Sequence, residues 1–387
     1  MSSLQREILR SKLPPVPPGG NGPPPTRRGR KDYSPVKWSQ YFEEIREIPV
    51  DGGDVFTVYR CQSADYKPEN PVLILLHGAG YSGLTWSCFA MEIVKMAKCG
   101  VIAIDLRGHG ESHSQNEEDL SAETMARDVG QIYKSLFPDQ ETQPPAILIG
   151  HSMGGALAVH VAARELIPVI AGLVVIDVVE GTAMDALQSM QNVLRCRPKT
   201  FNSLEYAVEW SCRSGQTRNI ESAKVSMPAM LKRISDGVPA TKLIGQSESQ
   251  DEAPKPAASG ASDTGIPEDE EAEFEKPEPP QAQRGFTWRI DLSLSEPFWE
   301  GWFKGLSATF LRCSGPKLLL LAGIDRLDKD LTIGQMQGKF QTQVLPKVGH
   351  AVHEDAPDKV AETIAAFLVR NQLCEKIGDF TPPSAGC

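Results

Sequence analysis

The sequence has 387 residues, a formal net charge of −10 and a sequence pI of about 5.3. So acidic a chain lacks the basic face of a nucleic-acid-binding protein, and we exclude that class. No apolar run reaches the ~18 residues of a membrane-spanning helix. Residues 1–12 are polar and charged and lack the apolar region of a signal peptide. We therefore expect neither a membrane nor a nucleic-acid partner.

The eight cysteines are scattered, with no Cys-x-x-Cys spacing and no histidines at the spacing of a zinc site. We expect thiols in a reducing compartment, with no metal and no cofactor.

Residues 1–32 are rich in proline and glycine and end in a basic cluster at 27–31. This composition predicts a disordered tail. The cluster is either a nuclear-import signal or part of a solvated tail. We expect a cytoplasmic protein, with nuclear import as the alternative.

Buried strands alternate with helical segments from residue 33 to residue 177. A hairpin comes first. Strands follow at Pro71–Leu76, Val101–Asp105, Ala146–Ile149 and Gly172–Asp177, with a helix at Trp86–Lys98 and another that starts at Ser121 and is amphipathic over Thr124–Tyr133. Continuous apolar strands separated by helices predict an α/β fold, with a mostly parallel central sheet and helices on both faces.

This rhythm breaks between residues 178 and 316, which we interpret as a lid insertion. Helices are expected at Ala183–Leu194 and Ser203–Arg213, and the acidic segment 246–283 is predicted to be disordered. Aromatic residues after it either line a binding surface or form the core of the lid: Phe286, Trp288, Phe298, Trp299, Trp302 and Phe303.

The core is expected to resume over 317–387. This part contains strands at Lys317–Gly323 and Phe340–Leu345 and a closing helix at Pro357–Asn371. The core therefore consists of 33–177 and 317–387.

The strand at Ala146–Ile149 runs into Gly150-His151-Ser152-Met153-Gly154 and then into a small-residue helix. Glycines two residues to either side of Ser152 have the spacing of a nucleophile elbow. The tight turn favours small neighbours, because strand and helix must approach closely. Ser152 is the candidate nucleophile, and a glycine-rich turn with an incidental serine is the alternative.

A serine nucleophile needs a base, and in hydrolases with an elbow the chain order is serine, acid, histidine. Five of the seven histidines precede the serine, adjoin it or lie in the helix behind it: His77, His109, His113, His151 and His160. His350 and His353 remain. We choose His350, because it directly follows a short strand.

The acid is left open by the pattern alone. Asp177 ends the strand after the elbow, whereas Asp325 and Asp328 follow the next core strand. Each of them can equally cap a turn or a helix.

An oxyanion site needs two aimed donors. The N–H of Met153 at the start of the elbow helix is the first. The second is expected from Ala79 or Gly80, in a glycine-rich turn that follows a buried strand.

Longer stretches carry a family resemblance. The stretches His77–Gly80, Ile104–Ser112, Gly150–Gly155 and Gly349–Asp355 together look like the α/β-hydrolase superfamily. More narrowly, the chain resembles the protein phosphatase methylesterase family over Trp38–Phe42, Asp119–Ala126, Ile149–Gly155, Ile176–Leu187 and Leu318–Gln337. The resemblance covers most of Trp38–Phe367, apart from the acidic segment.

The resemblance implies an α/β-hydrolase fold and a serine carboxylesterase. Its substrate would be the methyl ester on the C-terminal leucine of the type 2A protein phosphatase catalytic subunit, bound through its tail and its enzyme body. It also implies Asp177, rather than Asp325, as the acid beside Ser152 and His350. Two alternatives remain, namely a binding protein that sequesters the phosphatase and a general small-ester hydrolase.

Overall fold

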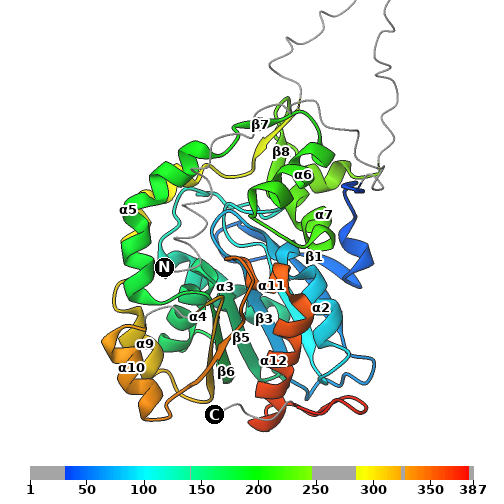
Figure 1. Cartoon of the computed structure of the whole chain (residues 1–387). Coiled ribbons are helices and arrows are strands. Elements are labelled where there is room, and N and C mark those ends of the chain that lie inside the picture. The colour runs from blue at the N-terminus through cyan, green and yellow to red at the C-terminus, as the bar shows by residue number, and fades with distance from the viewer. Residues whose placement is uncertain (1–30, 140, 246–284, 324–326, 383–387) are drawn as a thin grey trace, which may run out of the picture.

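The computed structural model describes residues 31–139, 141–245, 285–323 and 327–382. Within them, a central sheet has the strand order β1-β2-β4-β3-β5-β6-β10-β11 (Figure 1). Its strands are β1 (Glu44–Pro49), β2 (Val55–Gln62), β3 (Val72–Leu76), β4 (Gly100–Ile104), β5 (Ala146–His151), β6 (Ile170–Ile176), β10 (Lys317–Leu321) and β11 (Gln341–Val344). Only the pairs that involve β1 and β2 are antiparallel. The predicted mostly parallel sheet is confirmed.

The sheet is apolar on both faces, because polar and apolar residues do not alternate along its central strands. In β3, Ile74 and Leu76 point to one hydrophobic cluster, and Leu73 and Leu75 point to the other. All five residues of β3 are buried. Such a strand needs helices on both sides to exclude water.

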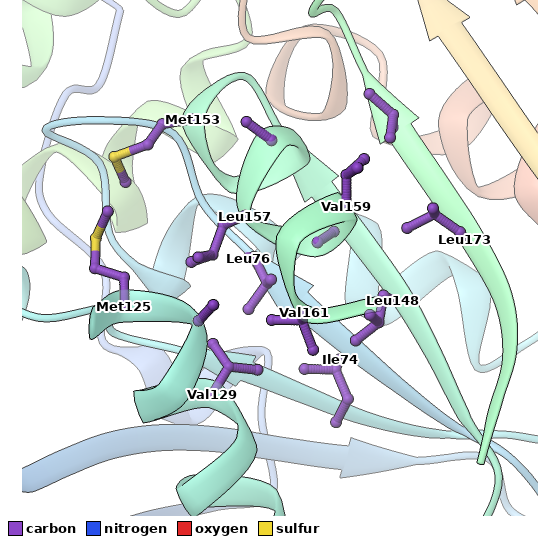
Figure 2. Packing of buried hydrophobic residues seen from close by; sticks show 14 of the residues in the cluster. Ile74, Leu76, Met125, Val129, Leu148, Met153, Leu157, Val159, Val161 and Leu173 are labelled. Atoms are coloured by element: carbon purple, nitrogen blue, oxygen red, sulfur yellow. The ribbon is translucent and has the colours of Figure 1, made fainter. Parts of the chain in front are cut away.

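Helices cover both faces. The first face carries α3 (Ala122–Leu136), α4 (Met153–Ala163), α8 (Glu296–Phe303) and α9 (Leu306–Arg312). Figure 2 shows side chains of α3 and α4 packed over Ile74, Leu148 and Leu173 of the sheet. The second face carries α2 (Ser87–Ile93), α7 (Ile220–Ala229), α11 (Val352–Asp355) and α12 (Pro357–Arg370).

The helix predicted over Trp86–Lys98 is shorter than expected. A 3-10 turn, η2 (Gly83–Trp86), precedes α2, which ends at Ile93. The chain then turns, and the Lys98 N–H donates a hydrogen bond to the Glu375 carbonyl at 2.8 Å. The last residues of the predicted helix therefore contact the C-terminal segment instead of continuing α2.

Between β6 and α8 the chain forms a cap at one end of the molecule (Figure 1), whereas α8 and α9, which follow it, pack on the first face of the sheet. It contains α5 (Glu180–Cys196), α6 (Leu204–Ser214) and α7, the 3-10 turns η3 (Ala240–Leu243) and η5 (Leu292–Ser295), and a small antiparallel sheet of β7 (Thr200–Phe201), β9 (Phe286–Trp288) and β8 (Leu231–Arg233). Two further elements lie outside this cap, namely η1 (Trp38–Gln40) and α10 (Lys329–Met336).

The aromatic residues of the insertion divide between two places. Trp299, Trp302 and Phe303 are buried in the main core, beside α4. Phe286 and Trp288 instead pack on the separate cluster of the cap. The segments predicted to be disordered lie outside the described residues, except for Lys31 and Asp32.

Close packing at Gly154 gives a stability prediction. A Cβ at this position would lie 2.2 Å from the Leu76 carbonyl oxygen, and backbone atoms cannot move away as a side chain can. We expect Gly154→Ala to lower the free energy of unfolding by about 1–3 kcal/mol, or to prevent folding. Urea unfolding measures this.

Gly301 is the matched control. It also lies within a helix, but a Cβ there meets no atom within 4 Å. Gly301→Ala should leave stability unchanged or raise it by up to ~1 kcal/mol, because alanine favours the helix. Equal effects of the two substitutions would contradict the packing argument.

Candidate active site

Ser152 lies at the turn between β5 and α4 in a strained backbone conformation. Its φ is 52° and its ψ is −118°, which side-chain-bearing residues rarely adopt. The turn is held because the Ser152 N–H donates to the Ile176 carbonyl at 2.9 Å, and its own carbonyl accepts from Gly155 N and Ala156 N. The serine is partly exposed, whereas its neighbours His151 and Met153 are buried. This is the geometry of a nucleophile elbow.

Glycines permit the turn. A Cβ at Gly150 would lie 2.0 Å from the Gly154 carbonyl oxygen, and a Cβ at Gly78 would lie 3.4 Å from the Ser152 Cβ. The elbow therefore packs directly on the turn at His77–Gly80, which follows β3.

The structure brings His350 and Asp177 together. His350 Nδ1 lies 2.7 Å from Asp177 Oδ2, and the imidazole N–H donates to the carboxylate. The other carboxylate oxygen accepts from Ala322 N at 2.9 Å. Asp177 also has a positive φ of 54° and directly follows β6, next to the elbow strand. Both side chains are almost entirely buried, which strengthens their interaction.

The alternative candidates lie elsewhere or outside the described residues. His353 is fully buried, with its ring 4.0 Å from the ring of Trp86 and its Nε2 3.0 Å from Thr85 Oγ1. Asp328 caps α10 by accepting from Leu331 N at 2.9 Å. Asp325 lies outside the described residues.

The two candidate oxyanion donors in the turn after β3 differ in whether their N–H group already donates a hydrogen bond within the protein. The Gly80 N–H donates to His109 Nε2 at 2.9 Å. His109 can accept it because burial lowers the pKa of this imidazole to about 4, and its Nδ1 donates to the Arg107 carbonyl. The Ala79 N–H donates no hydrogen bond to any described residue.

Met153 is the first residue of α4, and the first N–H groups of a helix lack intrahelical partners. The N–H groups of Met153 and Ala79 are thus the pair available beside Ser152.

His151 is a site residue that the sequence did not indicate. Its Nε2 donates to the His350 carbonyl at 2.9 Å, and the two rings lie 4.7 Å apart. Burial lowers the pKa of His151 well below its ordinary value, so it stays neutral. The residue before the nucleophile therefore holds the backbone of the base, which no spacing rule predicts.

The insertion also holds the loop that carries His350. Asp355 accepts from Arg218 N at 2.7 Å and from Gly349 N at 2.5 Å. The Arg218 side chain donates to the Lys347 carbonyl at 3.0 Å. Asp355 thus connects the residue before His350 to Arg218, two residues before α7, so the loop that carries the base contacts the insertion.

No group of three or more metal-ligating side chains with the geometry of a metal site occurs in the described parts of the chain. Over the same residues, no helix has both the length and the apolarity needed to cross a membrane.

The family model of the alpha/beta hydrolase family matches residues 73–363. The crystal structure of E-2-(acetamidomethylene)succinate hydrolase superimposes with a TM-score of 0.57 at 17% identity, covering 84% of this chain and 100% of that one. A thioesterase domain from the curacin biosynthetic pathway gives 0.53 at 20% identity, with 83% and 99% covered. The predicted class, an α/β hydrolase, is confirmed.

Relatives with similar sequences identify the family within the α/β hydrolases. Protein phosphatase methylesterase 1 of Mus musculus is 52% identical, and that of Homo sapiens is 51% identical, each over 100% of both chains. The probable protein phosphatase methylesterase 1 of Caenorhabditis elegans is 41% identical over 96% of this chain and 86% of its own. The chain belongs to the protein phosphatase methylesterase family, and it is a hydrolase.

Glu354, four residues after His350, gives a pH prediction. It is fully buried, and its carboxylate accepts from Thr217 Oγ1 at 2.8 Å. Burial raises its pKa from 4.5 to about 7. The folded state therefore holds this proton more tightly than the unfolded state, so the group lowers stability as the pH rises from 4.5 to 7.

Glu354→Gln should remove this penalty. Relative to wild type, the variant should gain up to about 3 kcal/mol of stability between pH 5 and pH 8, because one pKa unit corresponds to about 1.4 kcal/mol. Urea unfolding at the two pH values measures the difference. Glu362→Gln, which removes an exposed carboxylate from α12, controls for the loss of a charge. An identical pH dependence in Glu354→Gln and wild type would contradict the assignment.

Proposed function

We propose that the protein is a serine carboxylesterase that demethylates the type 2A protein phosphatase catalytic subunit. Its substrate is the methyl ester on the C-terminal leucine of that subunit. The relatives, which are protein phosphatase methylesterases, support this activity. The main observation in support of serine catalysis is the 2.7 Å hydrogen bond between His350 and Asp177, adjacent to the strained turn at Ser152.

In the first half of the proposed reaction, His350 Nε2 takes the proton of the Ser152 hydroxyl while Ser152 Oγ bonds to the ester carbonyl carbon. Asp177 holds Nδ1 protonated, which leaves Nε2 as the basic nitrogen and stabilises the imidazolium that forms. The carbonyl oxygen becomes an oxyanion, and it accepts hydrogen bonds from the N–H groups of Met153 and Ala79. His350 then gives its proton to the leaving oxygen, and methanol departs.

The second half reverses the same steps with water. His350 takes a proton from water, whose oxygen attacks the acyl carbon bound to Ser152. The C–O bond to Ser152 breaks, the serine regains its proton from His350, and the free carboxylate of the phosphatase leaves. No metal or cofactor has a part in these steps.

Asp177→Asn tests the acid. Asparagine has no carboxylate to keep the proton on His350 Nδ1. Demethylation of the methylated phosphatase should therefore fall about 10³–10⁴-fold. The measurement is methanol release under single-turnover conditions. Asp328→Asn is the matched control, because asparagine is as good a helix cap as aspartate and should keep α10 intact.

Equal losses in the two variants would contradict the role of Asp177. A general small-ester hydrolase is the competing function. It would be favoured if wild-type protein turned over simple acetate esters far faster than the methylated phosphatase.

A further inference from the structure

A groove on the insertion lies beside the turn that carries Ala79. It encloses about 640 Å³, a size typical of ligand sites. Its walls come from the end of α5, from β9 and from the residues that lead into η5. Trp288, Ile290 and Leu292 provide its apolar side.

The groove meets the catalytic site at Gly80. A Cβ built on Gly80 would lie 2.7 Å from Leu292 Cδ1 and 3.7 Å from Arg197 Nη1. Both of these side chains line the groove. The groove therefore adjoins the turn that carries Ala79 and Gly80.

The polar side of the groove is cationic, although the protein as a whole is acidic. Arg195, Arg197 and Lys199 line it, against the single carboxylate of Asp291. That carboxylate accepts from the N–H and the hydroxyl of Ser293 and so caps η5. Among the described residues, none of the three cations forms an ion pair.

Arg197 is held in position. Its guanidinium lies 5.0 Å from the centre of the Trp288 ring, and Trp288 Nε1 donates to the Pro198 carbonyl at 2.7 Å. The stacked pair presents a fixed positive charge beside an apolar wall.

We propose that this groove binds the peptide segment immediately N-terminal to the esterified residue, and that it selects acidic side chains in that segment. The inference rests on the proposed function, because the peptide that would bind in the groove is part of the substrate on which Ser152 acts. Arg195, Arg197 and Lys199 receive the carboxylates, and the wall formed by Trp288 and Leu292 receives apolar side chains between them. Charge complementarity and continuity with the oxyanion turn identify this occupant.

The test uses two N-acetylated hexapeptides that end in leucine methyl ester. They differ only at two positions among the four residues before the leucine, which are aspartate and glutamate in one peptide and asparagine and glutamine in the other. The readout is the ratio of kcat/KM for the acidic peptide to kcat/KM for the neutral peptide. Because each ratio is taken within one protein, a general loss of activity cancels.

Wild-type protein should prefer the acidic peptide about tenfold at low ionic strength, because exposed ion pairs contribute about 0.2–1 kcal/mol each. The ratio should approach one in the triple variant Arg195→Gln, Arg197→Gln, Lys199→Gln. It should also approach one for wild-type protein at 1 M salt, which screens exposed charges. The salt series keeps the proposal testable if the triple variant does not fold.

Arg127→Gln is the matched control, because Arg127 is an exposed arginine on α3 that pairs with Glu123 away from the groove. Its ratio should equal that of wild type.

A wild-type ratio near one, with both peptides hydrolysed, overturns the groove assignment and leaves the proposed function standing. Hydrolysis of neither peptide by wild-type protein that still demethylates the phosphatase overturns the groove assignment alone, and failure on the methylated phosphatase as well overturns the proposed function. A rise in the ratio in the triple variant also overturns the assignment, because it would show that the three cations do not favour acidic substrate.

Discussion

The structure depends on the close approach of β5, α4 and the turn after β3 at one point. Gly150 and Gly154 leave no room for a Cβ there, and Ser152 between them is held at a φ of 52°. A strained serine persists only where the surrounding packing determines its conformation. The buried strands and helices on both faces of the sheet provide that packing. The serine hydroxyl is therefore positioned by the core of the protein rather than by a loop.

The other members of the site follow from the same sheet. β6 lies beside β5, so Asp177 directly after β6 lies next to the elbow, and Ala322, directly after β10, donates its N–H to the carboxylate. His350 comes from a loop held from two sides, by His151 of the elbow and by Asp355, which contacts the insertion. The loop that carries the base is therefore hydrogen-bonded both to the elbow and to the insertion.

The sequence predicted the central strands well, because strands buried on both faces appear as continuous apolar runs. It also indicated Ser152, His350 and Asp177 as candidates, through the elbow spacing, elimination and family resemblance. It did not predict the pairing of β8 with β9, because these are three-residue strands more than 50 residues apart in the sequence. Nor did it distinguish Ala79 from Gly80, because the acceptor on His109 belongs to a separate turn. Such contacts between distant segments have no local signal.

The most direct test of the central claim compares wild-type and Ser152→Ala protein acting on purified, methylated type 2A phosphatase catalytic subunit. Demethylation and binding should be measured in the same samples. The account predicts that Ser152→Ala still binds the phosphatase but demethylates it at least ~10⁴-fold more slowly, because the members of a catalytic triad act as a unit. Demethylation by Ser152→Ala at a rate near that of wild type would contradict the account.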